Sequence, residues 1–376
     1  MLPIALKSFH IKGYRGIIDT ELITIPDNTQ WIFLTGENGF GKTSVLQGIV
    51  MGLINREERG SSFECVSNTT NNQIPKPENN EYNYEYLKQE LMNLNSIAAY
   101  GSTRLRVSSG TSLEVMKNSS PTSSLFSNDT LLINIEENFK DWKNNDLKSF
   151  NALENIFKTL IPQLHKIEVI FDKNEKRSKV KYYEKDVFGN VYNESIDFLD
   201  LAAGYKNIIA MIGDMINRLS FLVDLENLDT LNGIVLIDEI DLHLHPKYQK
   251  LFVQKLTELF PKIQFIVSTH SPIPLLGVGK DTKAAIINVS RTREEGIKAE
   301  LLDIDFSVLT PNAILSSPIF GFQDLIPESK SDDKMIRTED TYKEVLFNDQ
   351  LDKQISEYLT EDNQKELLDL LKEHNL

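Results

Sequence analysis

The segment from Gly36 to Thr43 reads G-E-N-G-F-G-K-T and matches the full G-x-x-x-x-G-K-[ST] pattern of a phosphate-binding loop. Its glycines let backbone N–H groups close around phosphate oxygens, and the helix that follows adds the positive end of its dipole. In this pattern the Lys42 ammonium reaches the β- and γ-phosphates, and the Thr43 hydroxyl helps to hold Mg²⁺. The segment therefore predicts a site for a nucleoside triphosphate and Mg²⁺.

Two polar segments farther along the chain could complete this site, because each follows an apolar run that reads as a buried strand. Asp238 and Glu239 end the first run, and His270 follows the second. A carboxylate at a strand tip can hold Mg²⁺, and its neighbour can orient or deprotonate a water aimed at the γ-phosphate. A histidine on the adjacent strand tip would face the same phosphate. The predicted metal ligands are thus Thr43 and Asp238, and the predicted catalytic residues are Lys42, Glu239 and His270.

His243 and His245 form another candidate cluster, an H-x-H pair just before Pro246. Two imidazoles could begin a zinc site, but no third ligand stands nearby in the sequence. Cys65 is the only cysteine, which excludes an intrachain disulfide and a C-x-x-C metal site. We expect the pair to shape the turn before a helix that begins at Pro246, and zinc is the less favoured alternative.

The elements that must position these residues alternate between strands and helices. Apolar runs predict strands at 31–34, 234–237 and 264–267, and helical periodicity predicts helices at 44–51 and after Gly204. This alternation predicts an α/β domain with a largely parallel sheet, in which the carboxyl ends of neighbouring strands meet at one edge.

The remaining segments read less regularly. Residues 4–25 alternate between apolar and polar side chains, as a pair of strands would. Residues 147–160 have a helical pattern. The stretches at 67–80 and 108–128 are rich in Asn, Ser and Thr, which favours exposed loops.

Composition limits the partners that the chain can take. The net charge of −15 repels nucleic acid at long range, so a DNA contact would need a local basic patch. We favour a solvated hairpin face over a DNA contact for the one cluster that qualifies, which contains Lys173, Lys176, Arg177, Lys179, Lys181 and Lys185. No apolar stretch is long enough to cross a bilayer and the N-terminus lacks a signal-peptide layout, so we expect a cytoplasmic protein without a membrane partner.

Taken in order, these motifs resemble the ATP-binding-cassette heads of the SMC, RecF and OLD group of AAA family ATPases. The opening F-H-I-K-G-Y-R-G at 9–16 is similar to the start of such heads, and the phosphate loop has their G-x-N-G-x-G-K-[ST]-[ST] form. The segment 238–246 is similar to their Walker B motif and D-loop, and His270 matches their switch histidine. The resemblance implies ATP and Mg²⁺ as ligands, with nucleotide contacts from Arg15, Gly36, Asn38, Gly39, Phe40, Gly41, Lys42, Thr43, Ser44, Ala203, Gly204, Tyr205 and Asp241.

The signature motif of this group maps to the segment L-A-A-G-Y at 201–205. In the group, this motif contacts the γ-phosphate bound by a partner subunit, so that two heads enclose two ATP molecules. Ala202 stands where the usual serine would supply a hydroxyl donor, while Gly204 and the helix N-terminus could still offer backbone N–H groups. The resemblance therefore implies a homodimer or higher homo-oligomer, with hydrolysis that this substitution slows.

The resemblance also implies a domain plan. It predicts an ATP-binding-cassette head over 1–326 with a mostly parallel core sheet, an N-terminal antiparallel β-subdomain and a helical insertion. Flexible insertions are expected near 66–80 and 108–130, and the signature helix subdomain at about 131–222. A charged helical tail would follow at 327–376.

The absence of a long coiled coil and of a nuclease module makes the chain most similar to the ATPase subunits of bacterial anti-phage systems such as Septu. Such a subunit controls a separately encoded nuclease of the HNH or TOPRIM type and meets DNA through the complex. The tail and the loop at 108–128 would be partner surfaces, or the tail packs on its own head. A RecF-like repair ATPase that binds DNA directly is the alternative. A transporter subunit is disfavoured because D-E-I-D replaces the usual D-E-P.

Overall fold

The computed structural model of the protein describes residues 2–22, 24–54, 63–70, 96–104, 107, 120–174, 176–220, 229–279 and 281–302. They all belong to the first of two units, Met1–Gly321. The predicted tail at 327–376 and the loop residues 71–80 and 108–119 lie outside the described residues, so these predictions remain untested.

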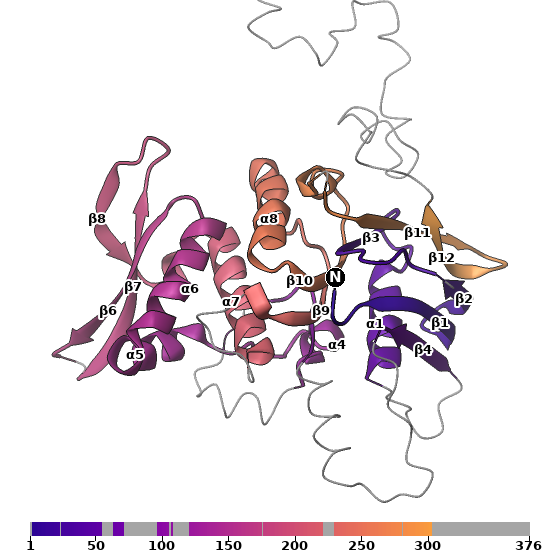
Figure 1. The fold of residues 1–376 in the computed structure, drawn as a ribbon, viewed down its shortest axis with the longest axis horizontal. Helices are drawn as coiled ribbons and strands as arrows, with labels where there is room; N and C mark the ends of the chain where they lie inside the picture. The colour runs from indigo at the N-terminus through magenta and orange to yellow at the C-terminus, as the bar shows by residue number, and fades with distance from the viewer. Residues whose placement is uncertain are drawn as a thin grey trace, which may run out of the picture. The chain divides into compact units, whose positions relative to one another are not determined.

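Nine strands form one sheet, which runs through the centre and right of Figure 1. They are β1 (Leu6–Tyr14), β2 (Ile17–Leu22), β3 (Trp31–Thr35), β4 (Glu64–Thr69), β5 (Ile97–Tyr100), β9 (Asn232–Ile237), β10 (Lys262–Ser268), β11 (Ala284–Thr292) and β12 (Gly296–Leu302). Their order in the sheet is β4-β1-β2-β12-β11-β3-β10-β9-β5. Pairing is antiparallel from β4 to β11 and parallel from β11 to β5, so the sheet is mixed.

Parallel pairing brings three polar loops to one edge of the sheet. Ile237 near the end of β9 is level with Val267 of β10, and Ser268 is level with Leu34 of β3. The phosphate loop after β3 therefore starts beside the segments that follow β9 and β10. This is the arrangement that the order of motifs predicted.

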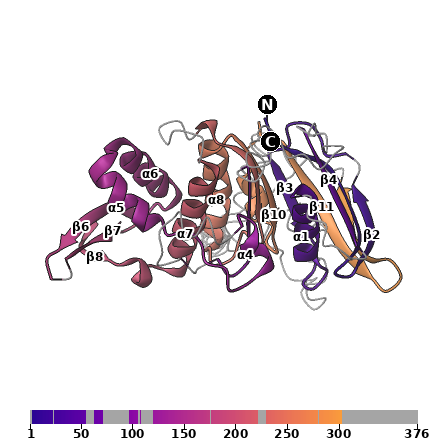
Figure 2. The same ribbon diagram turned by 90° about the horizontal axis from the view of Figure 1, so that it is seen from below.

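The central strands are buried on both faces because side chains alternate between two cores. Trp31 and Phe33 of β3 belong to a cluster with α7 (Ala203–Leu219) and α8 (Pro246–Leu259). Ile32 and Leu34 belong to a second cluster with α1 (Lys42–Leu53). Figure 2 shows α1 and the pair α7–α8 on opposite sides of β10. A run of five buried residues, rather than an alternating pattern, is what such a strand requires.

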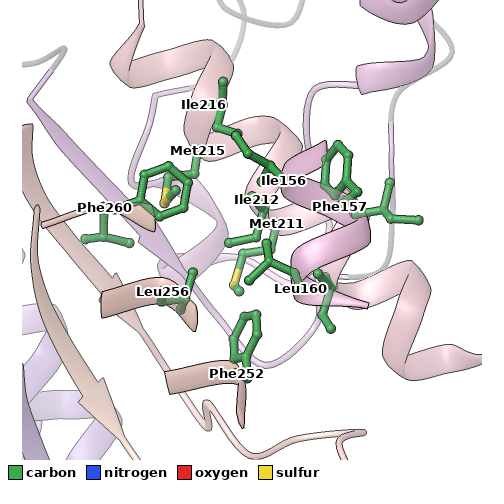
Figure 3. Packing of buried hydrophobic residues seen from close by; sticks show 14 of the residues in the cluster. Ile156, Phe157, Leu160, Met211, Ile212, Met215, Ile216, Phe252, Leu256 and Phe260 are labelled. Atoms are coloured by element: carbon green, nitrogen blue, oxygen red, sulfur yellow. The ribbon is translucent and has the colours of Figure 1, made fainter. Parts of the chain in front are cut away.

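Three of the helices in the larger cluster pack together beside the sheet (Figure 3). Helix α6 (Leu147–Leu160) presents an apolar stripe toward α7, and α8 closes the space beneath them. These side chains are buried because each helix has an apolar face at 3.6-residue spacing. The residues labelled in Figure 3 are Ile156, Phe157, Leu160, Met211, Ile212, Met215, Ile216, Phe252, Leu256 and Phe260.

The segment between β5 and α7 carries a small sheet as well as helices. Helices α4 (Ser123–Phe126), α5 (Ile135–Asn145) and α6 precede the antiparallel strands β6 (Leu164–Asp172), β7 (Arg177–Lys185) and β8 (Val191–Ile196). A short η1 turn (Phe198–Asp200) leads into α7, and η3 (Pro274–Gly277) follows β10. The predicted helical insertion is therefore an α+β unit.

The basic cluster lies on this small sheet. Lys179 Nζ is 2.9 Å from a carboxylate oxygen of Asp172, and Lys181 Nζ is 2.8 Å from one of Asp197. Opposite charges side by side on a hairpin are typical of a solvated face rather than a surface for phosphates.

The predicted α/β class, with parallel core strands and an antiparallel N-terminal part, is confirmed, but the two parts form one mixed sheet and the insertion predicted as helical also carries strands β6–β8. Two boundaries differ from the expectation: residues 66–69 belong to β4 and residues 123–126 form α4, although flexible insertions were expected near 66–80 and 108–130. Strand β4 is polar and is held in the sheet by its antiparallel pairing with β1. Local composition does not reveal such pairing. Within the described residues, none of the helices combines the length and apolar character needed to cross a bilayer.

Candidate nucleotide-binding site

The phosphate loop joins β3 to α1, and its last residues begin the helix. Helix α1 starts at Lys42, with Gly41 as its N-cap and no side-chain cap. The first N–H groups of a helix have no partner within it, so they remain available to an anion. The loop therefore fits the terminal phosphates of a nucleotide.

Two glycines of this loop are required by the space around them. A Cβ on Gly36 would lie 2.2 Å from the backbone oxygen of Val289, and one on Gly41 would lie 2.3 Å from Ile297 Cδ1. Their φ angles of +135° and +93° also fall where side chains are disfavoured. Contacts with β11 and β12 thus restrict the path of the loop.

The Lys42 side chain folds back over the loop. Its Nζ donates to the carbonyl oxygens of Gly36 at 2.7 Å and Glu37 at 3.1 Å, and lies 3.2 Å from His270 Nδ1. Burial lowers the pKa of Lys42, while the carboxylates of Asp238 and its neighbours act in the opposite direction. A partly desolvated ammonium at this point can neutralise phosphate charge more strongly than one in water.

Thr43 and Asp238 meet in the same place. Thr43 Oγ1 donates to Asp238 Oδ2 at 2.8 Å, and Ser268 Oγ donates to Asp238 Oδ1 at 2.5 Å. The carboxylate is buried, so these two hydroxyl groups fix its orientation. The start of α1 and the tip of β9 are joined by this contact.

Glu239 follows with an unusual backbone. Its φ is +52°, in the left-handed region, and its N–H donates to Ser268 Oγ at 2.8 Å. Such a conformation in a residue with a side chain is strained and occurs mainly where the surrounding structure enforces it. At this turn the chain leaves β9. The turn lies next to the Asp238 carboxylate, which is hydrogen-bonded to Thr43 and Ser268.

His270 lies at the tip of β10, beside Lys42. Partial burial lowers its pKa, and the nearby Lys42 ammonium lowers it further. The ring is therefore neutral at neutral pH, and a neutral ring nitrogen can accept a hydrogen bond from Lys42.

The structure thus brings together Lys42, Thr43, Asp238 and His270, with Glu239 next to them. Two other residues expected at the nucleotide form hydrogen bonds with side chains close to this site. Arg15 Nη1 donates to Gln47 Oε1 of α1 at 2.6 Å, and Asp241 Oδ1 accepts from Thr269 Oγ1 at 2.7 Å. Asn38 and Gly39 are exposed on the loop, whereas Phe40 packs partly on the core and Ser44 is half-buried.

The signature segment occupies another position, at the start of α7. Ala202 and Ala203 are exposed there, and a Cβ on Gly204 would lie 2.7 Å from the backbone oxygen of His243. Tyr205 donates to Gln163 Oε1 at 2.9 Å, and burial raises its pKa to about 12. Among the described contacts, no hydrogen bond joins this segment to the phosphate loop of the same chain.

Arg104 was missed by the sequence analysis. Its side chain is 1% exposed, and its guanidinium donates to the backbone oxygens of Asp238 at 2.5 Å and Glu239 at 2.7 Å. Desolvation lowers its pKa to about 10, so it stays charged at neutral pH. A single arginine after the apolar strand β5 has no spacing pattern, although its place at a third strand end could have drawn attention to it.

The donor set fits Mg²⁺ in the company of phosphates. Mg²⁺ commonly takes one or two protein oxygens, several waters and phosphate oxygens rather than an all-protein cage. Thr43 and Asp238 supply such a pair of oxygens. In the part of the chain that the structure describes, there is no cluster of three or more His, Cys, Asp or Glu residues that could hold a metal alone.

The H-x-H pair shapes a turn, which is the role that the sequence favoured over a zinc site. His245 is the N-cap of α8, and its Nδ1 accepts from the Lys247 N–H at 3.3 Å. His243 has a φ of +63°, which places it in the turn just before.

Comparisons with known proteins show what the chain is similar to. Residues 118–273 match the model of the AAA ATPase domain. The Septu protein PtuA of Bacillus mycoides is 30% identical over 86% of this chain and 45% of its own length. The Retron Vc95 probable ATPase of Vibrio cholerae is 34% identical over 49% of this chain and 32% of its own length. The chain therefore spans less than half the length of these curated relatives.

Among solved structures, the SMC head bound to the C-winged helix domain of ScpA covers 80% of this chain and 98% of that chain. Its TM-score is 0.48 at 13% identity. The predicted resemblance to ATPases of anti-phage systems is confirmed by the Septu and retron relatives.

Proposed function

We propose that this chain binds ATP with Mg²⁺ and hydrolyses it, as the ATPase component of a prokaryotic anti-phage defence system. The observation that carries the proposal is the contact between Thr43 and Asp238 beside the Lys42–His270 pair. Motifs far apart in the chain converge there on the start of α1. The Septu and retron names of its relatives support the defence context.

In this proposal each residue has one task. The loop N–H groups and Lys42 bind the β- and γ-phosphates, and Thr43 with Asp238 holds the metal. Bound Mg²⁺ would neutralise charge on the phosphate oxygens. Glu239 orients the attacking water and takes its proton, while neutral His270 faces the γ-phosphate. The electrostatic contribution is large because the carboxylate and ammonium are already in place and largely withdrawn from water.

Pairing of two heads is the second part of the proposal. The start of α7 exposes Ala203, with Gly204 half-buried beside it, so this end of the signature segment can contact ATP bound by another copy. Helix α7 offers backbone N–H groups there, because its N-cap Ala202 supplies no side-chain cap. The missing hydroxyl at this position is the reason to expect slow turnover.

The third part concerns the partner. An ATPase that closes around ATP can change how a separately encoded HNH or TOPRIM nuclease is presented, since ATP favours the closed form by its differential affinity. DNA would then be met through the complex. The paired charges on the β6–β7 hairpin give direct DNA binding, as in a RecF-like repair ATPase, no support.

The test uses ATP binding by calorimetry and phosphate release, both with Mg²⁺. We expect Lys42→Ala to lose ATP binding and Glu239→Gln to retain binding while turnover falls by about 10²-fold or more. Lys250→Ala, at an exposed lysine of α8, is the matched control and should behave as the wild-type chain. Tight ATP binding by Lys42→Ala, or undiminished turnover in Glu239→Gln, would refute the assignments.

A further inference from the structure

Arg104 is a buried cation whose hydrogen-bond partners are neutral. Its Nε donates to Asn207 Oδ1 at 2.8 Å, and its Nη1 to the Gly101 oxygen at 3.0 Å, in addition to the two bonds at Asp238 and Glu239. A guanidinium has five N–H donors in a rigid fork, which suits several acceptors at fixed positions. Burying such a charge is costly, so a fold retains it where the geometry of those acceptors matters.

The backbone oxygens of Asp238 and Glu239, which accept from Arg104, lie just beyond the end of β9, where the sheet no longer supplies hydrogen-bond donors to them. Strand β9 ends at Ile237, and beyond it the Asp238 N–H still donates to the Tyr100 oxygen at 2.8 Å. The Glu239 N–H turns to Ser268 instead. The two carbonyl groups of this turn face Arg104, so the peptide between the two carboxylate-bearing residues is held from both sides.

Asn207 of α7 orients the guanidinium. It is 2% exposed, accepts from Arg104 through Oδ1 and donates through Nδ2 to the Leu242 oxygen at 3.2 Å. One amide therefore bridges the arginine and the far end of the same turn. The turn at 238–242 is thereby joined to the first turns of α7.

We propose that Arg104, oriented by Asn207, is a positioning residue that fixes the backbone turn at Glu239 and thereby the direction of the Glu239 carboxylate. The inference rests on the proposed ATPase function for its kinetic consequence but not for its structural one. The strained φ of +52° at Glu239 is the conformation that these bonds maintain.

The variant that tests this is Arg104→Lys, which keeps a cation but cannot span the carbonyl groups. The matched control is Arg218→Lys, at another buried arginine, which bonds to Asp214 on α7 away from the phosphate loop. We expect Arg104→Lys to bind ATP within about threefold of the wild-type affinity while kcat falls by about 10²-fold, because misplacement of a catalytic group by about 1 Å has that effect. Arg218→Lys should lose thermal stability but keep kcat.

Amide hydrogen exchange supplies a readout that needs no activity. In Arg104→Lys, the amides of 238–242 should exchange about tenfold faster than in the wild-type chain, since charged hydrogen bonds hold this turn. In Arg218→Lys the same amides should be unchanged. Asn207→Ala leaves the arginine in place and should show a smaller increase in the exchange rate of these amides. It replaces Arg104→Lys as the test variant if Arg104→Lys does not fold.

The outcomes separate the two proposals. If the wild-type chain never hydrolyses ATP, the proposed function fails, and faster exchange at 238–242 still supports the positioning role. Unchanged exchange in Arg104→Lys or Asn207→Ala would overturn it. So would equal losses of kcat in Arg104→Lys and Arg218→Lys, because a general loss of stability would then explain both.

Discussion

At the scale of single residues, a threonine hydroxyl ties the phosphate loop to the tip of β9. Thr43→Val removes the donor to Asp238 while keeping the shape of the side chain. We expect the Mg²⁺ concentration for half-maximal turnover to rise by about tenfold or more, since a charged hydrogen bond and an oxygen ligand are both lost. Thr43→Ser keeps the hydroxyl and should stay near the wild-type value. Equal Mg²⁺ requirements in the two variants would contradict the role of this hydroxyl.

The lowered pKa of His270 predicts that the stability of the chain depends on pH. The folded-state pKa of this histidine is lowered by burial and by Lys42, so the unfolded chain binds the proton more readily. The stability is therefore fully present above the unfolded pKa of about 6.5 and falls as the pH drops through the lower, folded-state pKa. His270→Gln should reduce this slope in denaturant unfolding below about pH 6.5. An unchanged slope would show that other groups cause it.

The residues at this site differ in how far the sequence could reveal them. Lys42 and Thr43 follow from a motif with fixed spacing, and Asp238 and His270 follow from the rule that parallel strands end at one edge. Arg104 has neither kind of signal. Its partners are backbone oxygens and one amide, which exist only once the turn at 238–242 has formed.

At the scale of elements, a buried carboxylate joins β5 to α7. Asp214 accepts from the Tyr100 hydroxyl at 2.8 Å, from the Ile133 N–H at 2.8 Å and from Arg218 Nε at 2.7 Å. These bonds let a charged group lie in the core between the sheet and the helix.

Asp214→Ala should cost about 3–5 kcal/mol of unfolding free energy, because the carboxylate that neutralises buried Arg218 is lost. Urea unfolding measures the change. Glu258→Ala, which breaks an exposed pair with Lys255, is the control and should cost less than about 1 kcal/mol. A loss of similar size in both variants would mean that burial adds nothing to the Asp214 contacts.

Elements with strong local patterns were predicted, and polar strands that depend on pairing were not. The helix at Leu147–Leu160 has clear helical periodicity, and the central strands are continuous apolar runs. Strand β8 is exposed along most of its length and is a strand because it pairs with β7. Strand β4 is also polar, and it is a strand because it pairs with β1. Such pairing depends on tertiary context rather than on composition.

At the scale of the whole molecule, the exposed start of α7 is the surface through which the proposed pairing would occur. Ala203→Glu places a negative charge where a phosphate of the other copy would approach. In the Glu239→Gln background with ATP, we expect this variant to remain monomeric in size-exclusion chromatography while it binds ATP normally. Asn174→Glu, with the same charge change in the exposed β6–β7 turn, should still pair. Pairing by Ala203→Glu would exclude this surface.

The order of strands in the large sheet also bears on how the protein is made. Strand β3, which leads into the phosphate loop, ends at Thr35, but its two sheet neighbours begin at Lys262 and Ala284. A ribosome therefore delivers the loop long before the strands that flank it, and such distant pairing is slow to form. The nascent chain cannot assemble a working nucleotide pocket until nearly all of the described head has emerged.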